Sequence, residues 1–180
     1  METKRLFLSL PIPAQVNKIL EKYIRAYRHL HAKWVEEENR HITLLFIGDV
    51  PSEKISELEA LCENAVGSIP SFELSFESVC FFPSATHPHM IWARFHHSPQ
   101  FVLLSATMAQ IHQKTEQKET IAHVTLARLK EHHRQHIEFP ELHLPLIMID
   151  HFDLVESQLT KKGPIYTLIK SYPLCTNTAS

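Results

Sequence analysis

The order of hydrophobic and polar positions predicts two strands and two helices in the first third of the chain. Strands are indicated from Arg5 to Leu10 and from His41 to Ile47. Apolar residues recur at helical spacing from Val16 to Leu30 and again from Ile55 to Val66, and Ser52 stands in position to cap the second helix. The predicted order is therefore β-α-β-α.

In the middle of the chain the pattern changes to a period of two. Phe72 to Glu77 alternates apolar and polar residues, which predicts a strand with one buried face, and Met90 to Phe95 predicts the next strand. The turn-forming residues 83–88 between them favour an antiparallel pair. A helix is expected from Pro99 to His112, with Ser98 as its cap.

The last third of the chain predicts further strands, from Ile121 to Leu129, Leu144 to Leu154 and Ile165 to Tyr172. Residues 131–140 are polar and rich in histidine, and we interpret them as an exposed loop or a short helix. Residues 176–180 are expected to fray. Mixed helices and strands with several antiparallel hairpins indicate the α+β class rather than a doubly wound parallel sheet.

Composition narrows the range of functions. A length of 180 residues with 44% hydrophobic content fits a single domain spanning residues 1–180. Lys and Arg number 18 against 20 Asp and Glu, and the resulting charge of −2 excludes the broad positive field that long nucleic acids require. An RNA partner would therefore be contacted over a short stretch. Only three glycines are present, which excludes a phosphate-binding loop and a dinucleotide fingerprint.

The cysteines and the amino terminus indicate a cellular location. Cys62, Cys80 and Cys175 are odd in number and far apart, which suits a reducing compartment better than a disulfide framework. Met1 to Pro13 lacks the features of a secretion signal, and no apolar run approaches membrane-spanning length. We expect a cytoplasmic protein with no membrane contact and no obligate protein partner.

The most informative feature is a repeated tetrapeptide, His41-Ile42-Thr43-Leu44 and His123-Val124-Thr125-Leu126, placed each time in a predicted strand. Composition alone gives roughly one His-x-Thr per chain, so a single copy would indicate only an ordinary strand with a tolerated polar residue. Two copies that share the apolar second residue and the leucine call for an explanation. In a strand, residues two apart share a face, so each His emerges beside its Thr on a rigid apolar support.

Two such pairs facing each other would suit phosphodiester chemistry. One imidazole can withdraw a proton from water and the other can donate a proton to the leaving oxygen, because imidazole titrates near neutral pH. Hydroxyl groups of Thr43 and Thr125 can hold the non-bridging oxygens. This chemistry requires no metal.

Residues outside the tetrapeptides also match a known family over nearly the whole chain. The chain resembles the two-histidine phosphoesterases, in particular the RNA 2′,3′-cyclic phosphodiesterases, also called 2′-5′ RNA ligases. That resemblance implies a two-lobed α+β fold with pseudo-twofold symmetry, in which antiparallel sheets line a central cleft and helices lie outside. The matching segments are Arg5-Leu6-Phe7-Leu8-Ser9-Leu10-Pro11, Trp34, Leu45-Phe46-Ile47-Gly48, Ala127-Arg128 and Lys162-Gly163-Pro164-Ile165-Tyr166.

The same resemblance implies roles for the motif residues. His41 corresponds to the proton donor for the leaving oxygen, His123 to the proton acceptor that activates water, and Thr43 and Thr125 to the hydroxyls that hold the phosphate. The implied reaction opens a 2′,3′-cyclic phosphate on RNA, or on a small cyclic nucleotide, to a 2′-phosphate without a cofactor. Some family members also join RNA ends through a 2′-5′ bond. Ala122 stands where the family usually has proline, a change that removes no chemical group.

Four further residues are candidates for substrate binding. Arg128 could clamp a phosphate, but strict strand alternation puts its side chain on the face opposite His123, and only a bulge or a strand end would bring it round. Trp34, Phe46 and Tyr166 could stack on a base, although aromatic residues in or beside strands more often pack in a core.

Two other functions remain open. His87-x-His89, His96-His97 and His132-His133-x-x-His136 have the spacing of metal ligands, which a metal-dependent hydrolase would use. No cysteine or acidic residue completes a known ligand pattern there, so we favour incidental surface histidines. The other alternative is a non-catalytic module that binds RNA ends or nucleotides, but binding alone would not require a paired acid and base.

Overall fold

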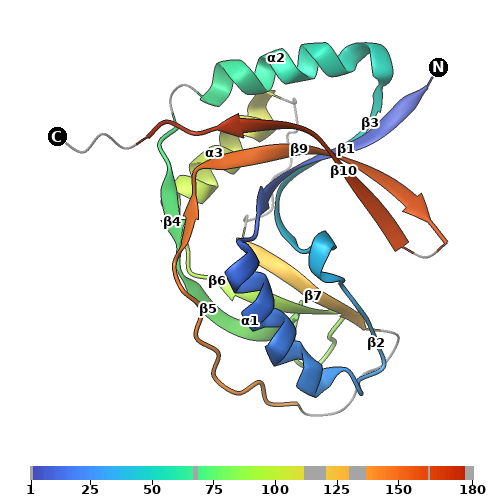
Figure 1. Cartoon of the computed structure of the whole chain (residues 1–180), viewed down its shortest axis with the longest axis vertical. Coiled ribbons are helices and arrows are strands. Elements are labelled where there is room, and N and C mark those ends of the chain that lie inside the picture. Colours follow the sequence, from blue (N-terminus) through green and yellow to red (C-terminus); the bar gives the residue numbers. More distant parts are fainter. Residues whose placement is uncertain (1, 67–68, 112–120, 130–136, 162, 177–180) are drawn as a thin grey trace.

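The computed structural model describes residues 2–66, 69–111, 121–129, 137–161 and 163–176, and these form an α+β fold (Figure 1). Within those ranges there are three α-helices, α1 (Ala14–Ile24), α2 (Ile55–Val66) and α3 (Pro99–Ile111), and ten strands. The strands are β1 (Thr3–Pro11), β2 (Ala32–Trp34), β3 (His41–Pro51), β4 (Phe72–Leu74), β5 (Phe76–Phe82), β6 (Met90–Phe95), β7 (His123–Leu129), β8 (Ile147–Ile149), β9 (His151–Thr160) and β10 (Gly163–Pro173). Short 3₁₀ turns lie at Arg25–Tyr27 (η1), Glu37–Asn39 (η2) and Ser52–Lys54 (η3).

Most strands in the described ranges form one open sheet in the order β10-β9-β1-β3-β7-β6-β5, with β2 also paired to β7 and every strand pairing antiparallel. The first four strands of this order make one half of the sheet, and the last three with β2 make the other half. The halves join where β3 meets β7, and there only Ile42 and Val124 are in register. Because the two strands pair over so short a stretch, the halves diverge on either side of this junction.

The helices cover the sheet with their apolar faces. Helix α1 buries Val16, Leu20 and Ile24, which are spaced for one side of a helix, and burying a side chain of this size contributes about 1.5–3 kcal/mol. Helix α3 packs against β3 and α2, and α2 in turn packs against β10. In Figure 1, α2 and α3 lie together beside the β9–β10 half, while α1 lies over the half that contains β7.

Most of the predicted elements are confirmed, including β6 at its predicted bounds and the β5–β6 hairpin. The Ser98 cap is confirmed because its hydroxyl accepts a hydrogen bond from the Phe101 amide at 3.2 Å. The prediction that Ser52 caps α2 is wrong. Ser52 lies inside η3, and its hydroxyl donates to the Glu2 carbonyl at 3.2 Å.

Three predicted elements are interrupted in the structure. The helix expected to reach Leu30 ends at Ile24 and continues only as the turn η1. The strand expected over 72–77 is divided between β4, which pairs with β8 in a separate small sheet, and β5 in the main sheet. The strand expected over 144–154 likewise divides into β8 and β9. In both cases two neighbouring segments pair with different partners, which local alternation cannot reveal.

Two predictions fall wholly or partly outside the described residues. For the polar stretch 131–140, only residues 137–140 are described, and they form no helix or strand. Of the carboxyl-terminal residues expected to fray, 177–180 lie outside the described part of the chain. No helix in the described ranges is both long enough and apolar enough to cross a membrane.

Candidate active site

The two tetrapeptides meet at the junction between the halves of the sheet. His41 is the first residue of β3 and His123 is the first residue of β7. Ile42 and Val124, the pair in register, are both fully buried in the core. The residues that flank Ile42 and Val124 in sequence point to the opposite face of the sheet. Both His-Thr pairs therefore emerge together on this face, which lines a cleft between the two halves.

Each motif strand carries a β-bulge directly after its threonine. Leu44 has no partner in β1, because Ser9 pairs with Thr43 and Leu8 with Leu45. The carbonyl group of Leu44, which lies at this bulge, accepts a hydrogen bond from the buried Ser105 hydroxyl of α3 at 3.1 Å. A bulge adds one residue, so the side chain of Phe46 returns to the face of Thr43.

The second motif repeats this arrangement. Leu126 has no partner in β6, because Ile91 pairs with Ala127 and Trp92 with Thr125. The carbonyl group of Leu126 accepts a hydrogen bond from the Val35 amide at 2.9 Å. The bulge brings Arg128 to the cleft, against the simple alternation that would place it on the other face. Phe46 and Arg128 thus hold equivalent places, each five residues after its histidine.

The cleft encloses a cavity of about 1170 Å³ that receives side chains from both halves of the sheet. All four motif residues line it, as do Arg128 and the three aromatic candidates Trp34, Phe46 and Tyr166. Phe46 is not a core residue, since 64% of its surface is exposed. The remaining lining residues are Arg5, Leu6, Phe7, Arg28, Lys33, Val35, Glu36, Glu38, Asn39, Gly48, Met90, Trp92, Ser157, Leu159, Thr160, Gly163, Pro164 and Ile165.

Hydrogen bonds to the backbone orient both imidazoles. The Nδ1 atom of His41 lies 2.8 Å from the carbonyl oxygen of Asn39, and that of His123 lies 2.8 Å from the carbonyl oxygen of Ile121. A carbonyl oxygen can only accept, so Nδ1 carries the hydrogen in both rings. This leaves each Nε2 to take up or release a proton. The Nε2 atom of His41 is 3.2 Å from the Thr43 hydroxyl.

Aromatic rings pack against the two imidazoles in different ways. Trp92 stacks on His123 with ring centroids 3.6 Å apart, and Phe82 stacks on the other side of Trp92 at 3.5 Å. His41 instead meets the edge of Tyr166 at 5.3 Å and a tilted Phe7 at 4.9 Å. The stack on His123 was not predicted, because it depends on the register between β6 and β7.

Both imidazoles are held toward their neutral forms. Burial lowers the pKa of His41 below its ordinary value of 6.5, and the positive charges of His123 and Arg128 lower it further, whereas the hydrogen bond to Asn39 opposes the shift. Burial also lowers the pKa of His123, opposed by the hydrogen bond to Ile121. An anion bound between the rings would favour their protonated forms and so reverse these shifts.

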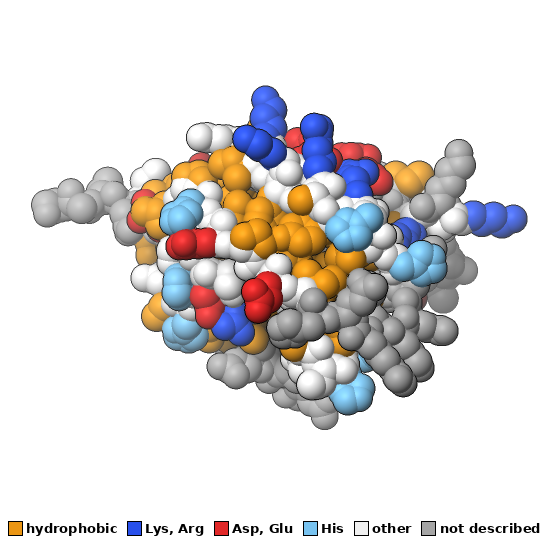
Figure 2. Space-filling model, turned by 90° about the horizontal axis from the view of Figure 1, so that it is seen from below, with side chains coloured by type: hydrophobic (Ala, Val, Ile, Leu, Met, Phe, Trp, Pro, Cys, Tyr) orange, Lys and Arg blue, Asp and Glu red, His pale blue; other side chains and the backbone are white. Residues whose placement is uncertain are grey.

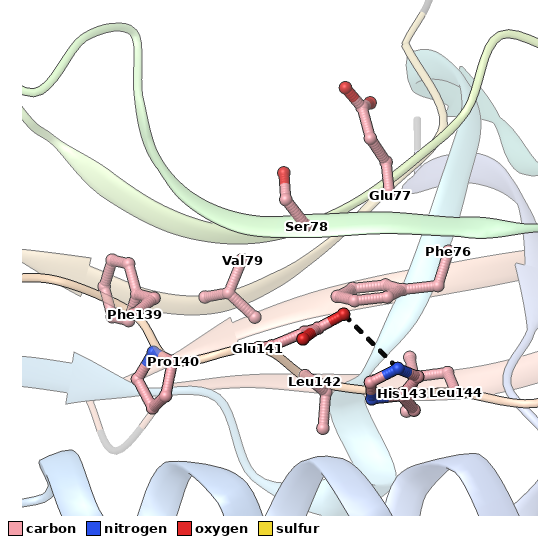
Figure 3. Close-up of a pocket in the computed structure, with 10 residues that line it drawn as sticks. All are labelled: Phe76, Glu77, Ser78, Val79, Phe139, Pro140, Glu141, Leu142, His143 and Leu144. Carbon is pink, nitrogen blue, oxygen red and sulfur yellow. Dashed lines mark ion pairs between the residues drawn. The ribbon is translucent and has the colours of Figure 1, made fainter.

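A second, smaller cavity of about 300 Å³ lies between β5 and residues 139–144 (Figure 3). Its polar groups include the exposed pair His143 and Glu141, joined at 3.3 Å, which Figure 3 marks with a dashed line. None of its lining residues is shared with the large cavity. It contains neither motif and is not the candidate active site.

The alternative of a metal site at the histidine clusters has no support in the described residues, where no group of three or more His, Cys, Asp or Glu side chains is placed to hold a metal ion. On the face drawn in Figure 2, several histidines lie around a central apolar area and do not gather at one point. His132, His133 and His136 lie outside the described residues.

Comparison with known proteins defines the class. A profile of the LigT-like phosphoesterase family matches residues 6–92. A protein of Thermotoga maritima is 30% identical, with 92% of each chain covered, and one of Methanocaldococcus jannaschii is 28% identical, covering 93% of this chain and 99% of its own. Both are named RNA 2′,3′-cyclic phosphodiesterase. This chain therefore belongs to the LigT-like phosphoesterase family.

Solved structures show the same fold. A Thermus thermophilus protein superimposes with a TM-score of 0.80 at 25% identity, covering 96% of this chain and 99% of its own. The apo structure of Escherichia coli LigT gives a TM-score of 0.83 at 21% identity, covering 97% and 99%. The α+β fold implied by the family resemblance is confirmed.

Proposed function

We propose that this protein hydrolyses the 2′,3′-cyclic phosphodiester at an RNA end to a 2′-phosphomonoester, by general acid and base catalysis without a metal ion. The observation that carries the proposal is the arrangement of the two imidazoles. Both lie in one cavity, both present Nε2, and both are oriented through Nδ1 by a backbone carbonyl. The names of the curated relatives support the same substrate and reaction.

The proposed reaction is a displacement at phosphorus. The Nε2 atom of His123 withdraws a proton from water as the water oxygen bonds to phosphorus. The bond from phosphorus to the 3′ oxygen breaks, and that oxygen takes a proton from Nε2 of His41. The product keeps phosphate on the 2′ oxygen. His123 is then protonated and His41 neutral, so each must exchange a proton before the next turnover.

Three further side chains stabilise the charge on the phosphoryl oxygens in this scheme. The hydroxyls of Thr43 and Thr125 donate to the non-bridging oxygens, and Arg128, brought to the cavity by its bulge, supplies a positive charge. Losing one such donor typically lowers turnover by about 10²–10³. The same groups support 2′-5′ ligation, in which the 5′ hydroxyl of a second RNA replaces water as the nucleophile.

The proposal also covers domain organisation and cellular location. We propose that the chain acts as a single domain, since side chains from both halves of the sheet line the cavity. We also propose that it acts in the cytoplasm, because three cysteines that lie far apart in the sequence suit a reducing compartment better than a disulfide framework.

The test is hydrolysis of a short RNA that ends in a 2′,3′-cyclic phosphate, with excess chelator present and the product isomer identified. Formation of the 2′-phosphate under these conditions is the expected result. A reaction that stops in chelator and returns with a divalent ion would overturn the metal-independent mechanism. The variant His143→Ala is a control that should keep the activity of wild type, because this exposed histidine lines only the smaller cavity.

A further inference from the structure

A second basic residue, Lys33, lies beside Arg128 on the wall of the cleft. Strands β2 and β7 pair with Lys33 directly opposite Arg128, and both side chains line the large cavity. Like charges directly opposite each other on neighbouring strands destabilise a sheet. Among the described residues, neither side chain forms an ion pair that would relieve this repulsion. Such a pair of cations is suited to an anion.

The cavity as a whole is more positive than the protein. Four basic side chains, of Arg5, Arg28, Lys33 and Arg128, line it against the two acidic side chains of Glu36 and Glu38, whereas the whole chain has a net charge of −2. Arg28 is paired with a carboxylate outside this lining set, that of Glu21, at 2.9 Å. An excess of one sign of charge in a cleft concentrates ligands of the opposite sign.

The ammonium group of Lys33 lies toward one end of the cleft. A methyl carbon added to Gly163, at the turn between β9 and β10, would lie 3.6 Å from Nζ of Lys33. The charge of Arg128, by contrast, lies close enough to His41 to lower the pKa of that imidazole. Arg128 thus lies near His41, and Lys33 lies near the turn between β9 and β10.

Apolar surface accompanies Lys33 at this end. Leu159 and Ile165, on either side of the turn, line the cavity and are 70% and 54% exposed. Exposed apolar side chains beside an ammonium group with no ion-pair partner among the described residues match the two parts of a nucleotide, a flat base and a charged phosphate. At about 1170 Å³, the cavity exceeds the usual range of about 300–1,000 Å³ for a site that holds one small ligand.

We propose that Lys33 binds the phosphodiester immediately 5′ of the terminal nucleotide, so that the enzyme prefers RNA chains to cyclic mononucleotides. The inference rests on the proposed function, because it assigns the terminal phosphate to the histidine pair. Neighbouring β-strands lie about 4.8 Å apart, so the side chains of Lys33 and Arg128 can contact consecutive phosphates of one RNA chain without rearrangement of the sheet. A cyclic mononucleotide has no second phosphate and forgoes the contact with Lys33.

The experiment compares Lys33→Met with wild type on a cyclic mononucleotide and on a trinucleotide that ends in a cyclic phosphate. We expect the variant to lose about tenfold more kcat/KM on the trinucleotide than on the mononucleotide, the usual size of one charged hydrogen bond. The salt dependence of the trinucleotide reaction should weaken by about 0.7 in logarithmic slope, the value for one contact to single-stranded nucleic acid. Lys33→Arg, which keeps the positive charge, should restore most of the preference for the trinucleotide.

Lys54→Met is the matched control, since it removes an exposed lysine that does not line the cavity. Equal losses of Lys33→Met on both substrates, or no loss on either, would overturn the inference while leaving the proposed function intact. If wild type hydrolyses neither substrate, the proposed function fails, and the affinity of the same variants for a 2′-phosphorylated trinucleotide then decides the inference. If Lys33→Met and wild type bind this trinucleotide with the same affinity at low salt, the inference about Lys33 is overturned.

Discussion

Replacing Arg40 with methionine should destabilise the fold and loosen the candidate acid His41. The guanidinium of Arg40 is fully buried and donates to the Val35 carbonyl at 3.1 Å, to the Asn17 carbonyl at 3.5 Å and to the Glu21 carboxylate at 2.6 Å. These contacts tie α1 to the segment that leads into β3. Asn39, whose carbonyl oxygen orients His41, is the residue immediately before Arg40.

The expected magnitude follows from what the substitution leaves behind. The variant leaves two carbonyl groups without this donor and removes the nearest cation from the Glu21 carboxylate, whose pKa is lowered first by the hydrogen bond from Arg40 and then by the charges of its arginine neighbours. Removing one partner of a fully buried ion pair costs about 3–5 kcal/mol, and the loss here should approach but not reach that range, because Glu21 is partly exposed and keeps Arg28 at 2.9 Å. Within the folded fraction, looser orientation of His41 should lower kcat by about tenfold, part of the 10²–10⁴ that a positioned acid provides.

Arg25→Met provides the matched control. Arg25 faces the same Glu21 carboxylate at 3.7 Å, but its side chain is largely exposed, and exposed pairs contribute about 0–1 kcal/mol. Urea unfolding gives the free energies of both variants, and kcat is measured well below the transition. A free energy of unfolding for Arg40→Met within 1 kcal/mol of that for Arg25→Met would refute the reasoning, since burial would then make no difference.

Two further predictions concern the imidazoles. Trp92→Leu removes the ring stacked on His123 and should lower kcat by about two- to tenfold, since such stacking is worth about 0.5–1.5 kcal/mol; an unchanged kcat would show that the stack does not position the base. The lowered pKa values of His41 and His123 mean that the unfolded chain binds more protons, so their contribution to stability is complete above about pH 6.5 and is lost as the pH falls through the lowered values. Thermal unfolding between pH 7.5 and 5 should show a smaller decline in a His41→Asn, His123→Asn variant, and identical declines would contradict the shifts.

The sequence was sufficient to predict the shared face of each His-Thr pair, because alternation within a strand is a local property. Residues two apart emerge together wherever the strand lies, and the buried Ile42 and Val124 agree with this prediction. That the two strands meet at this pair is a property of the whole fold. Only the repeat and the family resemblance indicated it.

The surroundings of the motifs could not be predicted, because they depend on pairing between distant segments. The position of Arg128 follows from a bulge opposite β6, and its neighbour Lys33 from the register of β2 against β7. Trp92 likewise reaches His123 only because β6 lies beside β7. Local patterns carry no information on these registers, and a single extra residue in a strand reverses the face of every residue after it.

The central claim is that His123 acts as the base and His41 as the acid, and the pH dependence of kcat/KM in single alanine variants tests it most directly. Wild type should give a bell, which rises as the base loses its proton and falls as the acid does. Because both pKa values are lowered, the bell should lie on the acid side of pH 6.5. His123→Ala should lose the rising limb and His41→Ala the falling limb, each with a rate lower by about 10²–10⁴. Loss of the opposite limbs would reverse the two roles, and a full bell at a near-normal rate in either variant would contradict the paired-histidine mechanism.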